Sequence, residues 1–347
     1  MIPDRRYARH VNLTDIARAC GVAPSTVSRA LNNPGRVSPA MHERISQKAI
    51  EMGYASATLP QGPERRSRGT IALLVPNLDN PFVHELVKGS QAQTQAAEFL
   101  FLLVNTEDSA HVEMKWLREL SQTVDGVVLS SPRSSDAELR SISDAVPMSI
   151  INREVDGISS VTIDTAASSV EALRYLVTLG HERIAFVRGP ESSWTSRERA
   201  AALEAATSDL DVELLPVGAF YPSLTAGAAA ADAVALTGAT GALFFNDTLA
   251  IGAMTRFRQR GISIPDDISV VGCDDIMAAE TSYPALTTIT GSGERAGRIA
   301  TEALISQFTE RAPRVRIETM AAHLTVRDST GPAPAAAPTI AAVSHMR

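Results

Sequence analysis

The stretch Leu13-Thr-Asp-Ile-Ala-Arg-Ala-Cys-Gly-Val-Ala-Pro-Ser-Thr-Val-Ser-Arg-Ala-Leu-Asn32 contains two short helical patterns separated by a turn. Asp15 falls in the first turn of the first pattern, near the positive end of the helix dipole, and Gly21 suits the end of that helix. Pro24 stands where proline is tolerated, at the first position of the second helix. A third helix is predicted from Pro39 to Met52. The spacing therefore predicts a helix-turn-helix closed by a third helix.

The second helix carries small polar and basic side chains on one side, a combination that fits a DNA major groove about 12 Å wide. The residues predicted to contact base edges are Ser25, Thr26 and Arg29, with Ser28 on the same side. The residues predicted to contact phosphates, in or near the loop that follows, are Asn32, Arg36, Ser38 and His42. The alternative is a three-helix module that docks a protein, but such an interface favours aromatic or Met anchors.

Charge divides the chain into two parts. Residues 1–68 hold eleven basic and five acidic side chains, whereas the remainder holds 21 basic and 34 acidic ones, for a net charge of -7. A basic N-terminal head on an acidic body suggests that the head binds a polyanion. The alternative is that these basic residues form a solvated tail.

Composition excludes several classes of protein. The longest apolar run, residues 99–104, is far shorter than the roughly 20 residues of a membrane span, and residues 1–10 lack the apolar segment of a secretory signal. Cys20 and Cys273 form neither a metal spacing nor a disulfide framework, which fits a reducing cytoplasm. We therefore expect a cytoplasmic protein of two or three domains, without membrane association, metal or cofactor.

From Thr70 onward, short apolar runs alternate with helical stretches, as in βαβ units. The predicted fold class is α/β, with the helix-turn-helix head followed by a two-lobed body of doubly wound parallel sheets. The predicted strands are 71–75, 99–104, 126–129, 148–151, 161–163, 184–187, 214–217, 242–245, 269–272 and 323–326. The predicted helices of the body are 82–97, 112–124, 166–179, 197–206, 226–236, 249–260 and 294–308.

Ligands of such sheets bind beyond the carboxyl ends of the strands, so we examined the residues that follow each predicted strand. These residues are Asn77, Asn80, Phe82, Ser130, Ser131, Asn152, Arg153, residues 188–199, Phe220, Tyr221, Asn246, Asp247, Asp274 and Asp275. Amides, carboxylates and guanidinium groups beside aromatic rings suit a polyhydroxylated ligand. For Asp247 and Asp275 a structural role in capping a helix or fixing a loop is the alternative. For Arg199 the alternative is a surface ion pair with Glu198 or a neighbour, and for Trp194 it is packing.

Several motifs resemble one known family. The stretch 13–32, followed by Val37-Ser38 and Gly53-Tyr54, is similar to the DNA-binding domain of the lactose/galactose repressor (LacI-GalR) family. In the body, Asn246-Asp-Thr-Leu-Ala-Ile-Gly252, residues 261–275 and Pro284-Ala-Leu-Thr-Thr-Ile289 resemble the effector-binding lobe of that family, with Cys273 where an aromatic residue is common. The likeness extends over most of the chain.

The resemblance implies a periplasmic-binding-protein-like body and a homodimeric regulator, usually a repressor, that binds palindromic double-stranded operator DNA under the control of a small effector such as a sugar or nucleoside. It places Pro24 and Ser25 at positions that set operator choice, with Arg29 contacting bases nearby. The residues that the resemblance and the strand ends together nominate for the effector are Asn80, Phe82, Ser130, Arg153, Asp164, Trp194, Arg199, Phe220, Tyr221, Asn246 and Asp274.

The predicted boundaries are a flexible arm (1–11), the helix-turn-helix domain (12–56), a linker (57–69), the effector-binding and dimerisation domain (70–330) and a disordered tail (331–347). Lobe 1 is expected over about 70–164 and 291–322, and lobe 2 over about 165–290 and 323–330. Pro60, Gly62 and Pro63 depart from the hinge helix of the family. Either Leu59 wedges into the minor groove, or the linker is extended with Arg65, Arg66 and Arg68 on phosphates.

Catalysis has little support in this sequence. The pair Asp274-Asp275 alone defines no acid/base geometry, and the chain has no phosphate-binding loop, zinc-protease motif or nucleophile elbow. We expect no enzymatic activity. The alternative from a different functional class is a sugar-binding protein or hydrolase whose N-terminal helices dock a protein partner.

Overall fold

The computed structural model describes residues 13–32, 37–52, 68–309 and 314–335. The chain divides after Ser67 into two compact units, which we call the head (described over 13–52) and the body (described over 68–335). The predicted arm 1–11, the linker as far as residue 67 and the end of the tail, 336–347, lie outside the described residues.

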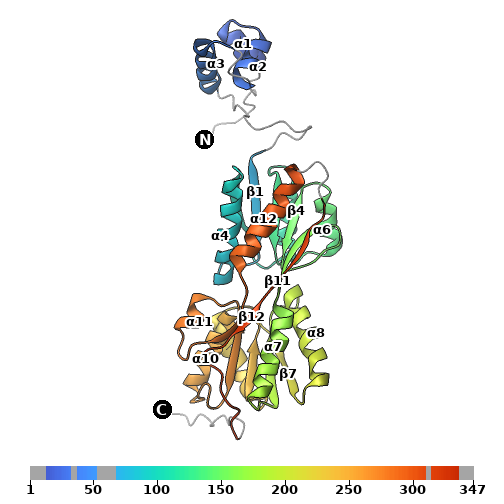
Figure 1. Ribbon diagram of the computed structural model, residues 1–347, viewed down its shortest axis with the longest axis vertical. Helices are drawn as coiled ribbons and strands as arrows, with labels where there is room; N and C mark the ends of the chain where they lie inside the picture. The colour runs from blue at the N-terminus through green and yellow to red at the C-terminus, as the bar shows by residue number, and fades with distance from the viewer. Residues whose placement is uncertain (1–12, 33–36, 53–67, 310–313, 336–347) are drawn as a thin grey trace, which may run out of the picture. The chain divides into compact units, whose positions relative to one another are not determined.

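Three helices enclose a small apolar core in the head (Figure 1). They are α1 (Leu13–Cys20), α2 (Pro24–Asn32) and α3 (Pro39–Glu51). Ile16, Val27 and Ile45 are fully buried between the helices. Gly21, with φ of 65°, occupies the left-handed conformation directly after α1, which glycine adopts without steric cost. The chain can therefore reverse direction between α1 and α2 within three residues.

Lobe 1 of the body is a parallel sheet of six strands in the order β11-β5-β4-β3-β1-β2. The strands are β1 (Thr70–Val75), β2 (Leu100–Asn105), β3 (Gly126–Ser130), β4 (Met148–Ile151), β5 (Ser159–Asp164) and β11 (Ile317–Ala321). One face is covered by α4 (Pro81–Ala96) and α12 (Gly293–Thr309), and the other by α5 (Ala110–Leu120) and α6 (Asp136–Ser143).

Lobe 2 has a second six-stranded sheet, in the order β12-β10-β9-β8-β6-β7, in which only the β10–β12 pair is antiparallel. The strands are β6 (Arg183–Arg188), β7 (Glu213–Ala219), β8 (Gly241–Phe244), β9 (Ser269–Cys273), β10 (Thr287–Thr290) and β12 (His323–Thr325). The helices are α7 (Thr165–Thr178), α8 (Trp194–Ala206), α9 (Leu224–Ala235), α10 (Asp247–Gln259) and the short α11 (Met277–Thr281).

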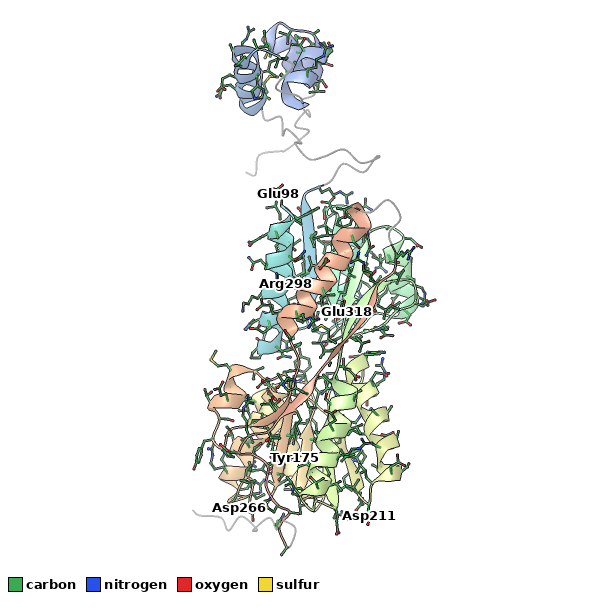
Figure 2. The ribbon with its side chains drawn as sticks, in the orientation of Figure 1. Glu98, Tyr175, Asp211, Asp266, Arg298 and Glu318 are labelled. Atoms are coloured by element: carbon green, nitrogen blue, oxygen red, sulfur yellow. The ribbon has the colours of Figure 1, made fainter. Side chains whose placement is uncertain are left out.

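The first strand of the body shows why its apolar run is continuous. Ile71 and Leu73 pack toward α4 and α12, whereas Ala72 and Leu74 pack toward α5 and α6. Successive side chains of a strand point to opposite faces, so a strand covered on both faces needs apolar residues at every position. Side chains fill the layers between sheet and helices in both lobes (Figure 2).

The chain passes between the lobes three times within the described residues: from β5 to α7, from β10 to α12 and from β11 to β12. Figure 1 shows the last crossing, where β11 at the edge of one sheet continues into β12 of the other. The sequence did not predict β10, β11, α6 or α11. β11 lacks an apolar run because four of its five residues are exposed at the sheet edge.

One prediction about the ends of the body is corrected by the structure. Residues 331–335, expected in a disordered tail, lie against lobe 2, where the backbone N–H of Ala333 donates to the carbonyl of Leu179 at 2.8 Å. At the other end, the side chain of Arg68 donates through Nη1 to the carbonyl of Val124 at 2.8 Å, and its contact with phosphate stays a prediction. Hydrogen bonds to backbone carbonyls, which composition does not reveal, hold both segments on the body.

Candidate functional site

The exposed side of α2 carries the residues predicted to contact bases. Pro24, Ser25 and Arg29 are exposed, whereas Thr26 and Ser28 are half-buried. These side chains surround the start and one face of a helix, as expected of an element that enters a major groove. The side chain of Asn32 and the whole of Arg36 lie outside the described residues.

Two residues predicted to contact phosphates have contacts within the head. Ser38 is exposed, and its Oγ accepts a hydrogen bond from the backbone N–H of Met41 at 3.4 Å, at the start of α3. Nδ1 of His42 lies 2.9 Å from the carbonyl oxygen of Ala30 and so joins α3 to α2. The imidazole of His42 therefore fixes the position of the predicted reading helix.

A cavity lies between the two lobes of the body, at the carboxyl ends of both sheets. The lobe 1 side includes Pro76, Asn77, Asn80, Phe82, Val83, Leu86, Asp108, Ser130, Ser131, Arg133, Asn152 and Ile163. Thr165, Ser193, Thr195, Arg199, Tyr221, Pro222, Phe245, Cys273, Asp274, Ile289 and Gly291 complete the lining. Hydroxyls, amides and charged groups thus face a space that is also bounded by aromatic rings.

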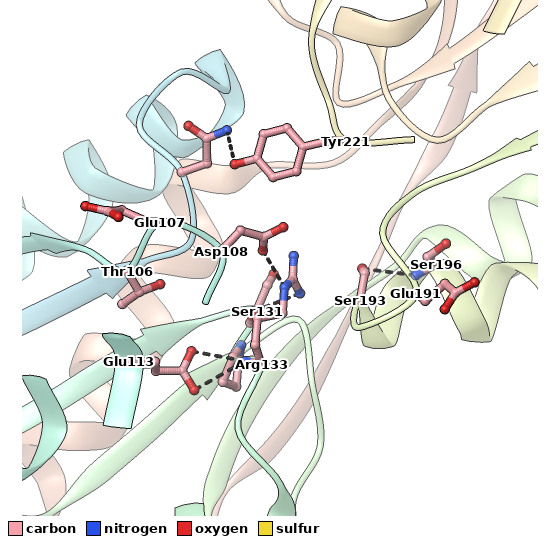
Figure 3. A network of polar contacts seen from close by, with 12 residues as sticks. Thr106, Glu107, Asp108, Glu113, Ser131, Arg133, Glu191, Ser193, Ser196 and Tyr221 are labelled. Atoms are coloured by element: carbon pink, nitrogen blue, oxygen red, sulfur yellow. Dashed lines mark hydrogen bonds and ion pairs between the residues drawn. The ribbon is translucent and has the colours of Figure 1, made fainter. Parts of the chain in front are cut away.

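Hydrogen bonds cross this cavity from one lobe to the other. Nδ2 of Asn77 donates to the hydroxyl of Tyr221 at 3.0 Å, and Figure 3 shows Tyr221 reaching toward the residues of lobe 1. Nδ2 of Asn80 donates to Oδ2 of Asp274 at 3.4 Å, while its Oδ1 caps α4. A ligand that contacts both sides will therefore favour the lobe arrangement in which these bonds are made.

Asp274 and Arg199 form the charged part of the lobe 2 wall. The pKa of the Asp274 carboxyl is raised to about 7, mainly by burial and also by the nearby carboxylate of Asp247, while Arg199 opposes both effects. The guanidinium of Arg199 lies 4.7 Å from the ring centre of Phe245 and donates through Nη1 to the Phe245 carbonyl at 2.7 Å. Its buried Nε has no hydrogen-bond partner among the described residues.

Cys273 contributes a buried, neutral surface to the wall. Burial raises the pKa of its thiol, so the reactive thiolate is disfavoured. Its side chain therefore acts as a small apolar group in the cavity.

Backbone conformation is unusual around the cavity. Ser131, Asn152 and Asp274 have φ values of 47°, 59° and 116°, and Asp108 has 56°. Each follows the carboxyl end of a strand, and non-glycine residues rarely adopt such angles. Strained backbone of this kind is concentrated at binding sites, where it aims side chains that a regular turn would direct elsewhere.

The structure brings together six of the eleven residues nominated for the effector, because all six line the cavity: Asn80, Phe82, Ser130, Arg199, Tyr221 and Asp274. Asn77, Ser131 and Asn152, noted after their strands, line it as well.

The other five nominated residues lie outside the cavity lining. Asp164 and Asn246 cap α7 and α10, where their oxygens accept from the N–H groups of Ala167 and Leu249. The remaining three are Arg153, Trp194 and Phe220. Arg153 donates to the carbonyls of Pro132 and Ser134, Phe220 packs against the lobe 2 core, and Trp194 is the first residue of α8.

Sequence reasoning missed twelve residues of the lining, among them Asp108, Arg133, Thr165, Phe245 and Cys273. Asp108 follows β2 by three residues, so the rule applied to the other strands would have found it. Arg133 likewise follows β3 by three residues, so the same rule, carried three positions past each strand, would have found it as well.

Comparisons with known proteins agree with both parts of this architecture. Residues 12–56 match the model of the lacI family of bacterial regulatory proteins, and residues 173–330 match the periplasmic binding protein-like domain. The transcriptional regulator DegA of Bacillus subtilis is 31% identical over 79% of this chain and 85% of its own length. The chain belongs to the LacI family.

Two further relatives of this LacI-family chain cover most of its length. The transcriptional repressor PurR of Vibrio vulnificus is 30% identical over 91% of this chain and 98% of its own. A solved structure of the transcriptional regulator CelR with cellobiose is 26% identical, with a TM-score of 0.69 over 92% of this chain and 99% of that one. The chain is accordingly a LacI-family transcriptional repressor with a ligand-binding domain, and its relatives are regulators rather than enzymes.

Two features are absent from the described residues. No helix in this part of the chain is long and apolar enough to cross a membrane. Within the same residues, no cluster of His, Cys, Asp and Glu is placed to hold a metal ion.

Proposed function

We propose that this LacI-family repressor acts in the cytoplasm as a homodimer that binds a palindromic operator and responds to a polyhydroxylated effector, most simply a sugar. Two copies of the head read two half-sites about one helical turn apart, because a two-fold protein matches a two-fold DNA site. The effector occupies the cavity between the lobes.

The observation that carries the proposal is the set of hydrogen bonds across this cavity. Asn77 with Tyr221 and Asn80 with Asp274 join residues of opposite lobes. A ligand bonded to the same groups changes the relative stability of open and closed bodies, and only such differential binding shifts an equilibrium. A coupling of about 1 to 3 kcal/mol to DNA affinity is typical of such regulators.

The residues proposed to contact DNA are Pro24, Ser25, Thr26, Ser28, Arg29, Asn32, Arg36 and Ser38. Those proposed for the effector are Asn80, Phe82, Ser130, Arg199, Tyr221 and Asp274, joined by the other polar residues of the lining. Hydroxyl groups of a sugar find donors in Arg199 and acceptors in Asp274, while the Phe82 and Tyr221 rings offer apolar surfaces to its C–H groups.

The test begins with selection of binding sites for the full-length chain from random double-stranded DNA, followed by fluorescence anisotropy on the enriched site. We expect a palindrome and salt-sensitive binding. Arg29→Ala should weaken specific binding by about 1 to 3 kcal/mol and relax base preference at one position of each half-site. The control is Arg298→Ala, which removes the same charge from an exposed position of α12 in the body.

Absence of an enriched site, or equal effects of the two substitutions, would contradict the proposed role of the head. Addition of neutral sugars to the complex then tests control by the effector. A DNA affinity that no cavity ligand changes would refute the regulatory part of the proposal.

A further inference from the structure

A buried ion pair forms part of the lobe 1 wall. Nε of Arg133 donates to Oδ1 of Asp108, and the two side chains are only 7% and 9% exposed. Nη1 of Arg133 also donates to the carbonyl of Ser131 at 3.0 Å. Figure 3 shows this pair opposite Tyr221, which extends from lobe 2. The arginine is thus held in one orientation at the cavity surface.

The loop that carries Arg133 is fixed by two further charged side chains. The buried carboxylate of Glu113 accepts from the backbone N–H groups of Arg133 and Ser134, both at 3.0 Å. On the other side, Nη1 of Arg153 donates to the carbonyls of Pro132 and Ser134 at 2.9 and 2.8 Å. Such support reduces the entropy lost when the pair binds a ligand, which is typical of a preorganised site.

The ion pair keeps unused hydrogen-bonding capacity on adjacent atoms. No described residue pairs with Oδ2 of Asp108 or with Nη2 of Arg133 through a hydrogen bond. Figure 3 shows the second oxygen of Asp108 directed away from Arg133. Burial, with the charges of Asp108 and Asp79, raises the pKa of Tyr221, which keeps its hydroxyl protonated. An acceptor and two donors therefore lie near one another at one end of the cavity.

Charges on the cavity lining balance. Among the described residues of the lining, the charged side chains are those of Asp108, Arg133, Arg199 and Asp274. Arg133 is paired with Asp108, and above pH 7, where Asp274 is ionised, the charge of Arg199 is offset by that carboxylate. A phosphate group would bring negative charge beside two carboxylates without meeting an unpaired cation. Like charges in a desolvated site are unfavourable, and this selects against anionic ligands.

We propose that Asp108 and Arg133 read two adjacent hydroxyl groups of the effector, and that the charge-balanced cavity accepts a neutral polyol and rejects its phosphorylated form. One hydroxyl donates to Oδ2 of Asp108, and its neighbour accepts from Nη2 of Arg133. This inference rests on the proposed use of the cavity as the effector site, and it adds a specificity-determining pair and a ligand class.

The test is isothermal titration calorimetry of the full-length chain with matched sugars at pH 8, where Asp274 is ionised. The probes are D-ribose, D-glucose and D-fructose, each with its terminal phosphate ester, and the 2-deoxy forms of the first two. For every neutral sugar that binds, we expect affinity at least about 10-fold above that of its phosphate and of its 2-deoxy form, because charge-assisted hydrogen bonds are lost or opposed. Tighter binding of a phosphate, or binding by no neutral sugar, would overturn the inference.

Asp108→Asn provides the second arm, because it leaves the charge of Arg133 unpaired. We expect neutral-sugar affinity to fall about 10-fold or more and the preference against the phosphate to shrink or reverse. The control is Asp232→Asn, which removes a carboxylate paired with Arg256 and Arg260 away from the cavity.

Wild-type affinity in the Asp108→Asn variant would overturn the role of the pair, while the wild-type measurements remain decisive if that variant does not fold. Calorimetry without DNA separates the two proposals. A chain that binds neutral sugars but does not alter its DNA affinity contradicts the proposed function and leaves this inference standing.

Discussion

Replacement of Asp274 by Asn tests the electrostatic account of the cavity without knowledge of the effector. Burial raises the pKa of Asp274 in the folded protein to about 7, from an ordinary value of 3.8. Above pH 7 the folded state must therefore hold an ionised carboxylate that the structure stabilises less well than water does. Asn has nearly the same shape and never ionises, so Asp274→Asn should stabilise the body at alkaline pH.

The direction in which stability changes with pH follows from proton binding by Asp274. Between pH 4 and pH 7 the folded state retains a proton on Asp274 that the unfolded chain has released, so stability falls as pH rises through this range. The pKa of Asp274 differs by about three units between the folded and the unfolded state, which corresponds to about 4 kcal/mol in the free energy of unfolding. Asp274→Asn should therefore raise the free energy of unfolding by at most about 4 kcal/mol at pH 8, by about 2 kcal/mol at pH 5 and by almost nothing at pH 3.

Urea unfolding of the full-length chain measures this difference through tryptophan fluorescence, since the two tryptophans of the chain, Trp116 and Trp194, both belong to the body. Asp232→Asn is a control of opposite sign. Hydrogen bonds from Arg256 and Arg260 lower the pKa of Asp232. Loss of this carboxylate in Asp232→Asn should therefore destabilise the body at pH 8, and the destabilisation should become smaller as pH falls. The reasoning would be refuted if Asp274→Asn were less stable than the wild type at pH 8. It would also be refuted if the substitution changed the free energy of unfolding equally at pH 5 and pH 8.

Further predictions concern the cavity and the packing of lobe 1. Effector affinity should rise about 10-fold from pH 6 to pH 8 in calorimetry and lose this dependence in Asp274→Asn, because a ligand hydroxyl donates best to the ionised carboxylate. Tyr221→Phe removes the acceptor for Asn77 and should weaken effector binding by about 0.5 to 1.5 kcal/mol in the same assay. Gly89→Ala should destabilise the body by about 1 to 3 kcal/mol in urea unfolding, because the new Cβ would lie 1.9 Å from the carbonyl oxygen of Glu294.

Most elements of the fold are visible in the sequence because their cause is local or periodic. Apolar runs such as 71–75 must be strands covered on both faces, and the intervening helical spacing predicts the layers around them. β11 and β10 escaped this reasoning for different reasons. β11 is an exposed edge strand held by pairing with β5, whereas β10 is a four-residue strand, three of them Thr, that forms between β9 and β12.

The candidate site was predictable in part. Residues at or shortly after the ends of strands, such as Asn80, Ser130 and Asp274, line the cavity because parallel strands end at one edge of each sheet. The same rule nominated Arg153 and Asn246, whose side chains instead hold a loop and cap a helix. Position along a strand fixes where a residue stands, but hydrogen-bonding neighbours decide which way its side chain turns.

The amino-acid sequence alone determined the helix-turn-helix, the alternation of strands and helices and the basic head on an acidic body. These properties depend on residues near one another in the chain, or on simple counts of charge. Only the tertiary structure decided that Asp108 and Arg133 pair, that Arg199 stacks on Phe245 and that Asn77 meets Tyr221 across the lobes. Each contact joins segments brought together by folding, so its geometry depends on the whole set of packed elements and on no single stretch.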